Sequence, residues 1–269
     1  MTFPHIDLTI DGPVGTVWLN RPEKHNALSE DMWADLPMAM AQLDNDPAVR
    51  VIVVGGRGPS FSVGIDLGML ASLSPPGRSE AERRQALRGK IKELQATMSA
   101  VASCRKPVIA AVHGYCLGAG MDLITACDLR LAAEGAVFSV RETRMGLVAD
   151  VGALQRLPHI VSAGYLAELA FTGADIDATR AAEIGLVNRV LPDHEQLMKA
   201  TNELAEAVAA NSPLVVEGIK AVLRAGEGQS VQEGLDYVAL WNAAFLLSDD
   251  LGEAIAAHLE KRPPDFQGR

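Results

Sequence analysis

Two apolar runs, interrupted only by Arg50, constrain the fold of this chain most strongly. They are VRVIVVGG at 49–56 and PVIAAV at 107–112. Each run has the length of a strand but does not alternate apolar with polar residues, which is typical of strands covered on both faces. Helices on both sides of a sheet supply that cover, so the two runs predict an α/β fold.

Strand and helix signals alternate over roughly residues 1–192. Residues 6–10 and 14–19 predict a hairpin around a short Asp-Gly-Pro turn. A helix is expected over 28–44, with Ser29 as its N-cap. The later helices are expected at 153–171, 178–184, 194–210, 213–225, 231–247 and 249–261.

No linker or repeat marks a domain boundary, so the division rests on the change from alternation to helices. We expect a core that carries the functional site at 1–200 and a helical oligomerisation region at 201–269. The helical region carries apolar stripes, so it must pack on the core, on a neighbouring subunit, or on both.

Charge and composition exclude several classes of partner. The formal net charge is −10, which argues against nucleic acid and against an anionic membrane surface. No stretch reaches the roughly 18 apolar residues of a membrane span. The start lacks a signal-peptide pattern, and the three cysteines form neither a disulfide framework nor a metal-ligand spacing. We therefore expect a cytoplasmic protein with no metal.

Two glycine-bearing loops follow the two apolar runs. FSVGID, 61–66, comes after the first run, and GYCLGAG, 114–120, joins the second to a helix. If each loop presents a free backbone N–H to one point, the pair forms an oxyanion hole that stabilises an enolate. The alternative is that both are ordinary tight turns, and spacing alone does not decide between them.

Three acidic residues lie among Gly, Ala, Val and Leu, where an unpaired carboxylate is costly to bury. They are Asp122, Glu142 and Asp150. Each has a plain structural explanation: Asp122 could cap its own helix, Glu142 could pair with a neighbouring arginine, and Asp150 could cap a helix that begins near residue 152. The alternative is proton transfer. His113 offers little competition, because a turn histidine bonded to backbone explains it.

Several motifs in order resemble the crotonase superfamily, also called the enoyl-CoA hydratase/isomerase family. The stretches that carry the resemblance are LNRPEKHNALS, FSVGIDL, KPVIAAVHGYCLGAGMDLITACDLRLA, GLVADVGALQRLP and KRPPDF. Within the family the chain is most similar to the dienoyl-CoA isomerases. The resemblance implies an α/β, ClpP-like spiral of strand–strand–helix turns, with a C-terminal helical trimerisation region.

The resemblance also assigns residues. It implies an acyl-CoA thioester whose carbonyl oxygen accepts from the backbone N–H groups of Val63 and Ala119. Asp122 and Glu142 occupy the positions of the two catalytic glutamates of hydratases, and Asp150 matches a third acid of dienoyl-CoA isomerases. The residues expected to bind substrate or coenzyme A are Lys24, Ala27, Leu28, Phe61, Ser62, Val63, Gly64, Ile65 and Ala119.

The implied reaction converts 3,5-dienoyl-CoA to 2,4-dienoyl-CoA in unsaturated fatty-acid β-oxidation. Asp150 takes the C2 proton, Glu142 delivers one to C6, and Asp122 hydrogen-bonds Glu142. No cofactor is expected, since coenzyme A is part of the substrate, and the assembly is expected to be a homotrimer or a hexamer formed as a dimer of trimers.

One alternative is an enoyl-CoA hydratase that uses Asp122 and Glu142 to activate water. A second alternative, a dehalogenase-like enzyme, requires more aromatic residues than the 4% present in this chain. A non-catalytic acyl-CoA- or RNA-binding scaffold is the alternative from another class.

Overall fold

Six strands form the central sheet of the computed structural model, in the order β1-β2-β3-β4-β6-β9. The structure describes residues 2–71 and 73–269; Met1 and Ser72 fall inside the predicted core but lie outside the described residues. The first two strands form the predicted hairpin and are antiparallel, and every later pair in the sheet is parallel. The strands are β1 (Ile6–Asp11), β2 (Val14–Leu19), β3 (Val51–Gly56), β4 (Val108–Val112), β6 (Leu129–Ala133) and β9 (Arg189–Leu191).

Helices cover both faces of this sheet, as the apolar runs predict. On one face, Val51 and Val53 of β3 pack with residues of α8 (His194–Ala209). On the other face, Ile52 and Val54 join the larger core with α1 (Glu30–Asn45), α3 (Glu80–Ser103) and α4 (Ala119–Thr125). Successive residues of a strand point to opposite faces, so a strand buried on both faces needs an apolar residue at every position.

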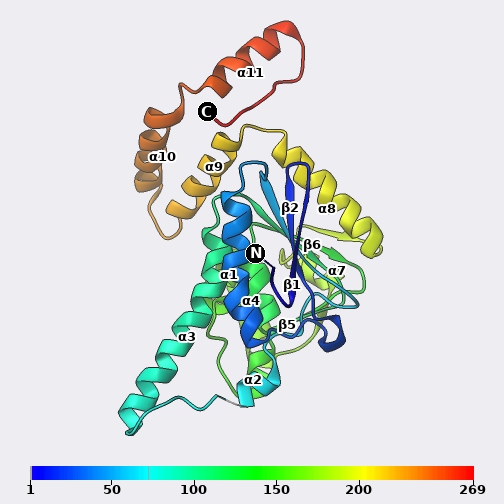
Figure 1. The fold of residues 1–269 in the computed structure, drawn as a ribbon, viewed down its shortest axis with the longest axis vertical. Helices are drawn as coiled ribbons and strands as arrows, with labels where there is room; N and C mark the ends of the chain where they lie inside the picture. The colour runs from blue at the N-terminus through cyan, green and yellow to red at the C-terminus, as the bar shows by residue number, and fades with distance from the viewer. Residues whose placement is uncertain (1, 72) are drawn as a thin grey trace.

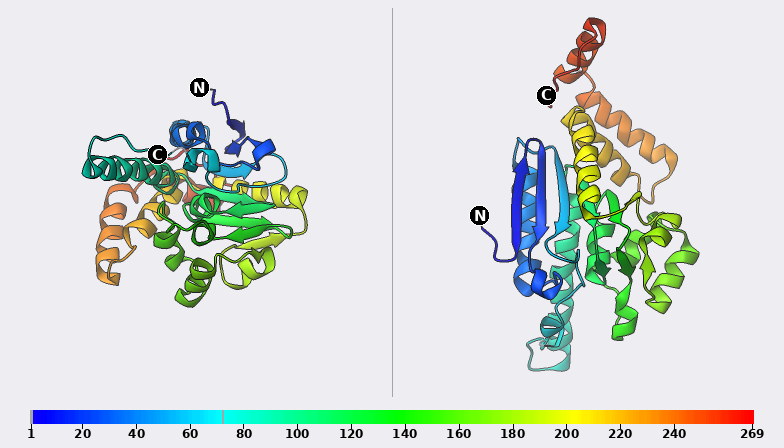
Figure 2. Two further views of the ribbon diagram at one scale, coloured as in Figure 1. Left: turned by 90° about the horizontal axis from the view of Figure 1, so that it is seen from below. Right: turned by 90° about the vertical axis from the view of Figure 1, so that its right-hand side faces the viewer.

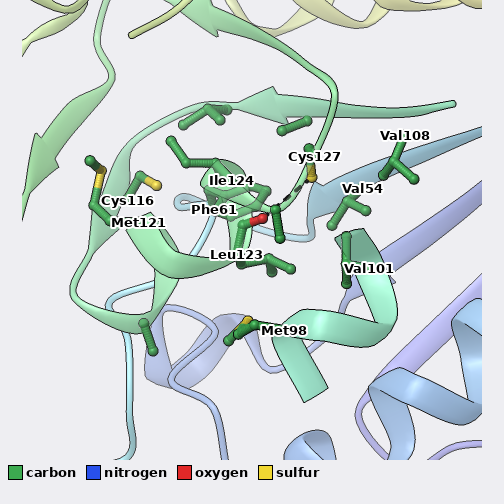
Figure 3. Close-up of a cluster of buried hydrophobic side chains, with 14 of the residues drawn as sticks. Val54, Phe61, Met98, Val101, Val108, Cys116, Met121, Leu123, Ile124 and Cys127 are labelled. Carbon is green, nitrogen blue, oxygen red and sulfur yellow. Dashed lines mark hydrogen bonds between the residues drawn. The ribbon is translucent and has the colours of Figure 1, made fainter. Parts of the chain in front are cut away.

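A second, three-stranded sheet lies beyond the carboxyl end of β4. Its strands are β5 (Tyr115–Leu117), β7 (Val137–Ser139) and β8 (Ile176–Asp177). The chain passes from β4 through Gly114, whose φ is +56°, into β5 and then directly into α4. Every residue of α4 is buried, and Met121, Leu123 and Ile124 contribute to the apolar cluster in Figure 3.

The helix expected over 153–171 is interrupted. The structure has α5 (Ala153–Arg156), a 3₁₀ turn at Leu157–His159 and α6 (Ala163–Thr172). Pro158 lies in the 3₁₀ turn, and proline has no N–H to continue an α-helical ladder. The break ends α5 after about one turn and gives α6 a separate start at Ala163.

The predicted division at residue 200 falls inside a single helix. α8 runs through it without interruption, and its Leu197, Ala205 and Ala209 are buried against the sheet. The boundary therefore lies after α8, where α7 (Ala178–Glu183) and all strands have already been completed. The remaining helices are α9 (Pro213–Ala225), α10 (Val231–Phe245) and α11 (Asp249–Glu260).

These last three helices extend away from the body of the molecule (Figure 1), and the right-hand view of Figure 2 shows the same projection. No residue of α10 is buried. Several large apolar side chains of the region are exposed, among them Leu223 at 69%, Leu240 at 71% and Leu247 at 94%. No described helix has both the length and the apolar character that crossing a membrane requires.

Lys220 anchors α9 to the core. Its Nζ donates to the Asp128 carboxylate at 2.6 Å and to the Lys106 carbonyl at 2.9 Å. The lysine is 6% exposed; its bond to the Lys106 carbonyl is buried, and its bond to the more exposed Asp128 is partly buried. Buried polar groups of this kind are costly when one partner is removed.

We expect Lys220→Met to lower the free energy of unfolding by about 1–3 kcal/mol, because Asp128 and the Lys106 carbonyl each lose a donor. Lys199→Met on α8 is the matched control, since Lys199 is exposed. Urea unfolding of the two variants and the wild type provides the measurement. Equal unfolding midpoints for both variants would show that Lys220 does not anchor α9.

Candidate active site

Three separate segments meet at the predicted thioester site. The Leu28 N–H donates to the Gly64 carbonyl at 2.8 Å, and the Asp66 N–H donates to the Leu28 carbonyl at 3.0 Å. On the other side, the Ser62 N–H donates to the Tyr115 carbonyl at 2.8 Å. The early motif, the 61–65 loop and β5 are therefore joined by main-chain hydrogen bonds.

Most of the predicted binding residues lie in this assembly. Ala27, Leu28, Phe61 and Ser62 are buried, and so is Ala119 at the start of α4. Gly64 packs so closely on the start of α4 that a Cβ at this position would lie 3.0 Å from the Ala119 nitrogen. Binding at these positions stays a prediction, but the structure does bring them together. Val63 and Ile65 are half-buried, and Lys24, at the end of the 3₁₀ turn Pro22–Lys24, is exposed.

The structure argues against Val63 as an oxyanion donor. The Val63 N–H already donates to the His25 carbonyl, at 3.1 Å. Ile65 pairs with Leu28 as a parallel bridge in which Leu28 bonds to residues 64 and 66, so the N–H of Ile65 itself points away from Leu28. Within the described part of the chain, this N–H has no backbone acceptor. The free donor of the loop is therefore Ile65, two residues after the predicted one.

The N–H of Ala119 is available, and its role as an oxyanion donor stays a prediction. Ala119 is the first residue of α4, so its N–H has no acceptor within the helix. The residue before it, Gly118, has φ +51°, which turns the chain sharply out of β5. The two free N–H groups, of Ile65 and Ala119, thus come from neighbouring segments.

Asn26 and His113 are two residues that the sequence reasoning left out of the site. Asn26 is fully buried, and its side-chain amide donates to the carbonyls of Arg57 and Ser60 at 2.9 and 2.7 Å. His113 contacts the Gly58 carbonyl through Nε2 at 2.8 Å, which confirms that it is bonded to backbone. For Asn26 and His113, the only signal in the sequence was a position beside a glycine-bearing loop or a motif.

Asp122 is fully buried on α4. One carboxylate oxygen accepts from the Ala153 N–H, and the other has no hydrogen-bond partner among the described residues. Ala153 is the first residue of α5, so Asp122 caps a neighbouring helix rather than its own. Capping therefore explains one oxygen and leaves the second available.

Glu142 lies in the 3₁₀ turn Arg141–Met145, directly after β7. The neighbouring arginines are engaged elsewhere: Arg141 pairs with Asp175, and Arg144 donates to the Thr172 carbonyl. One oxygen of Glu142 is buried without a partner among the described residues, and the other lies 3.3 Å from the point where a Cβ on Gly118 would stand. The pairing of Glu142 with a neighbouring arginine is thus wrong.

Asp150 is the most exposed of the three acids. It does not cap α5, whose N-cap is Gly152. Gln95 of α3 donates to the Asp150 carbonyl at 2.6 Å, which holds the loop against that helix. Asp150 also lines a groove of about 1080 Å³ between α3, α4 and α9, which neither Asp122 nor Glu142 reaches.

The three acids influence one another electrostatically. Burial raises the pKa of Asp122 to about 7, and the negative charge of Glu142 adds to the shift. Burial likewise raises the pKa of Glu142, with a contribution from Asp150, and partial desolvation raises the pKa of Asp150. Clustered carboxyl groups in a poorly solvated site cannot all be ionised cheaply, so they titrate as a coupled set. No hydrogen bond joins Asp122 to Glu142 among the described residues, so the predicted contact is replaced by coupling through space.

Arg156 is a cation that opposes this accumulation of negative charge, because it lowers the pKa of Asp122. Its guanidinium lies over the main chain of Gly152, where Nη1 occupies the space that a Cβ would need. Gly152 has φ +133°, a backbone conformation that favours glycine. The glycine therefore provides both the turn and the space for the cation.

Together these groups can carry out proton transfer beside a stabilised oxyanion. Two free N–H groups can bind a developing negative charge, and three acids with raised pKa values stand close enough to influence one another. The described residues contain no cluster of three His, Cys, Asp or Glu side chains able to hold a metal ion. The three cysteines are free and buried.

The sequence and the structure both place this chain in a known family. The enoyl-CoA hydratase/isomerase family profile matches residues 9–269. The protein belongs to this family, the crotonase superfamily, and the predicted family and spiral α/β fold are confirmed.

Individual relatives narrow the comparison. The chain is 46% identical over 259 residues to the peroxisomal Delta(3,5)-Delta(2,4)-dienoyl-CoA isomerase of Arabidopsis thaliana, covering 95% of this chain and 93% of the relative. It is 42% identical to the mitochondrial Delta(3,5)-Delta(2,4)-dienoyl-CoA isomerase of Homo sapiens, covering 91% and 76%. Among solved structures, an enoyl-CoA hydratase from Bacillus anthracis superposes with a TM-score of 0.90 at 31% identity, covering 98% of this chain and 100% of that one.

Asp122→Asn tests the cost of the buried charge. The pKa of Asp122 is about 7 in the folded protein and ordinarily 3.8, so between these pH values the folded protein holds a proton that the unfolded chain releases. Wild-type stability therefore falls as the pH rises from about 4 to about 7, and the full penalty applies above that range. The uncharged variant escapes this penalty, so its gain in unfolding free energy over the wild type should grow across the same range and then level off.

Urea unfolding at about pH 5 and about pH 8 measures this difference. Asp11→Asn, at an exposed strand end, controls for the loss of one carboxylate. A gain for Asp122→Asn that is the same at both pH values would mean that Asp122 does not carry the buried charge.

Proposed function

We propose that this protein isomerises 3,5-dienoyl-CoA thioesters to 2,4-dienoyl-CoA thioesters. The observation that carries the proposal is the third acid: Asp150 stands at the open groove and acts electrostatically on Glu142, which is more deeply buried. Two acids at different depths suit a reaction that removes a proton from one carbon and adds a proton to a second carbon, four positions away. The dienoyl-CoA isomerases of A. thaliana and H. sapiens, at 46% and 42% identity, support the same activity.

The oxyanion donors in this proposal are the N–H groups of Ile65 and Ala119. They bind the thioester oxygen, which becomes negative when the C2 proton leaves. Val63 lies in the same loop, but its N–H donates to the His25 carbonyl. In the ground state the carbonyl is neutral, so the two hydrogen bonds strengthen as the dienolate forms and lower the barrier rather than only improve binding.

In this proposal each acid has a separate role in the proton transfers. Asp150 removes the C2 proton as a carboxylate, and the electron pair spreads over a conjugated dienolate from the oxygen to C6. Glu142 then gives a proton to C6, which leaves double bonds at C2 and C4. Glu142 must be protonated before this step, and its raised pKa suits that state. Asp122 is coupled to Glu142 through space, so ionising both acids at once is costly.

A hydratase is the closest alternative, and the B. anthracis relative carries that name on the same fold. It would use Asp122 and Glu142 to hold water and would leave Asp150 without a role. A non-catalytic scaffold would not need three acids with raised pKa values, and the net charge of −10 disfavours RNA. The absence of a cofactor stays a prediction, with coenzyme A entering as part of the substrate.

Assembly and location complete the proposal. We propose a homotrimer, or a dimer of such trimers, in which α9–α11 pack on neighbouring copies, because α10 has no buried residue in the single chain. A cytoplasmic location also stays a proposal. The relatives named for peroxisomes and mitochondria make those organelles the alternative.

Asp150→Asn should abolish isomerase turnover while acyl-CoA binding is kept, because the amide cannot take the C2 proton but preserves the shape of the side chain. The measurement is the near-ultraviolet absorbance of the conjugated dienoyl thioester formed from a 3,5-dienoyl-CoA, with binding followed separately by calorimetry. Asp11→Asn is again the control. Turnover near the wild-type level in the Asp150 variant would overturn the assignment.

The same preparations distinguish the hydratase. Wild-type protein should act faster on a 3,5-dienoyl-CoA than on a 2-enoyl-CoA. A hydratase would show the reverse order, and Asp150→Asn would then leave the hydration rate nearly unchanged. Failure of both substrates, with tight acyl-CoA binding retained, would favour the scaffold.

Light scattering of the purified protein tests the assembly. We expect a mass of three or six chains, since the exposed apolar side chains of α9–α11 lose contact with water in such an assembly. A monomeric mass at all concentrations would contradict it.

A further inference from the structure

We propose that His113 is a positioning residue for the oxyanion hole, fixing the loop that carries the Ile65 donor to the segment that carries the Ala119 donor. This inference rests on the proposed thioester chemistry and adds a residue to it. An oxyanion hole built from two different segments works only if their separation is fixed, within about half an ångström in productive sites. A side chain that ties the two segments together therefore affects the rate without touching the substrate.

His113 occupies the position that this role needs. It follows β4 and comes six residues before Ala119 on one continuous segment. Its Nε2 lies 2.8 Å from the Gly58 carbonyl, at the start of the loop that leads to Ile65. Its own carbonyl accepts from the Phe61 N–H at 2.8 Å, so the residue holds the loop at two points.

The state of the imidazole follows from its surroundings. A carbonyl oxygen only accepts hydrogen bonds, so Nε2 must carry a hydrogen and donate it. Nδ1 is buried without a hydrogen-bond partner among the described residues, and the ring of His194 packs beside it with centroids 4.2 Å apart. Burial lowers the pKa of His113, which favours the neutral ring with its hydrogen on Nε2. The ring is thus a fixed donor aimed at one carbonyl.

The other contacts of the loop do not replace the bond from His113 to the Gly58 carbonyl. Asn26 already engages the carbonyls of Arg57 and Ser60. Gly114, after His113, lies so close to Pro59 that a Cβ there would overlap the Pro59 carbonyl oxygen. Beyond the loop, Ser62 pairs with β5 through both its N–H and its carbonyl. Loss of the His113 donor would leave the Gly58 carbonyl unpaired at the point where the loop turns toward the donor residues.

The test compares His113→Leu, which removes the donor, with His113→Gln, whose amide can donate to the same carbonyl. We expect kcat to fall about 10- to 100-fold in the Leu variant with KM little changed, in line with the effect of small displacements of catalytic groups. The Gln variant should recover most of the wild-type rate. His194→Gln is the matched control, because it removes the ring contact but keeps the bond to Gly58.

A second readout separates positioning from general destabilisation. Hydrogen bonds to the thioester oxygen polarise the conjugated system, so bound hexa-2,4-dienoyl-CoA should absorb at longer wavelength than the free thioester. At saturation this shift should be full in the wild type, nearly full in His113→Gln and reduced in His113→Leu. A full shift in a folded His113→Leu protein, or an equal loss of rate in His194→Gln, would overturn the inference.

The outcomes remain distinct if a variant or the proposed function fails. Should His113→Leu not fold, His113→Asn replaces it, since its shorter amide falls short of the Gly58 carbonyl; a full shift with His113→Asn then overturns the inference and a reduced shift supports it. Should the wild type fail to isomerise dienes yet still shift the absorption of the bound thioester, the isomerase proposal is wrong and the positioning role is still tested by the same spectra.

Discussion

Main-chain hydrogen bonding across the 61–65 loop is the interaction on which the site depends. This loop pairs with the early motif through Leu28 on one side and with β5 through Ser62 on the other. It thereby joins segments that are far apart in sequence and leaves one amide, that of Ile65, without a backbone acceptor among the described residues. The large sheet supplies the rigid base for this arrangement, because β3 and β4, which lead into the loop and into β5, are neighbours in it.

The buried acids show a compromise between stability and function. Burying Asp122 and Glu142 costs solvation, and only part of that cost is offset, by the Ala153 N–H and by the charge of Arg156. A fold selected only for stability would replace such groups with apolar ones. Keeping them gives the site carboxyl groups with raised pKa values, which suits proton transfer between carbon atoms.

The sequence predicted the parts of the structure that depend on local pattern. The two apolar runs became strands covered on both faces, and the motif order identified the family and its fold. It failed where the outcome depends on which neighbour an atom meets. The direction of the Ile65 N–H follows from pairing with Leu28, 37 positions away in sequence. Pro158 interrupts a run that reads as one helix, and the continuity of α8 comes from packing on the sheet rather than from any change in composition.

The contact between Gly152 and Arg156 has a consequence for how this protein can vary. Because the guanidinium occupies the space that any side chain at 152 would need, a substitution at 152 must also move Arg156. A larger residue at 152 displaces the cation, and a smaller one at 156 removes that obstacle but leaves a φ of +133° at 152 that still favours glycine. Substitutions at the two sites are thus expected to be epistatic. A side chain at 152 therefore acts on Asp122 indirectly, because it moves the positive charge that lowers the pKa of that acid.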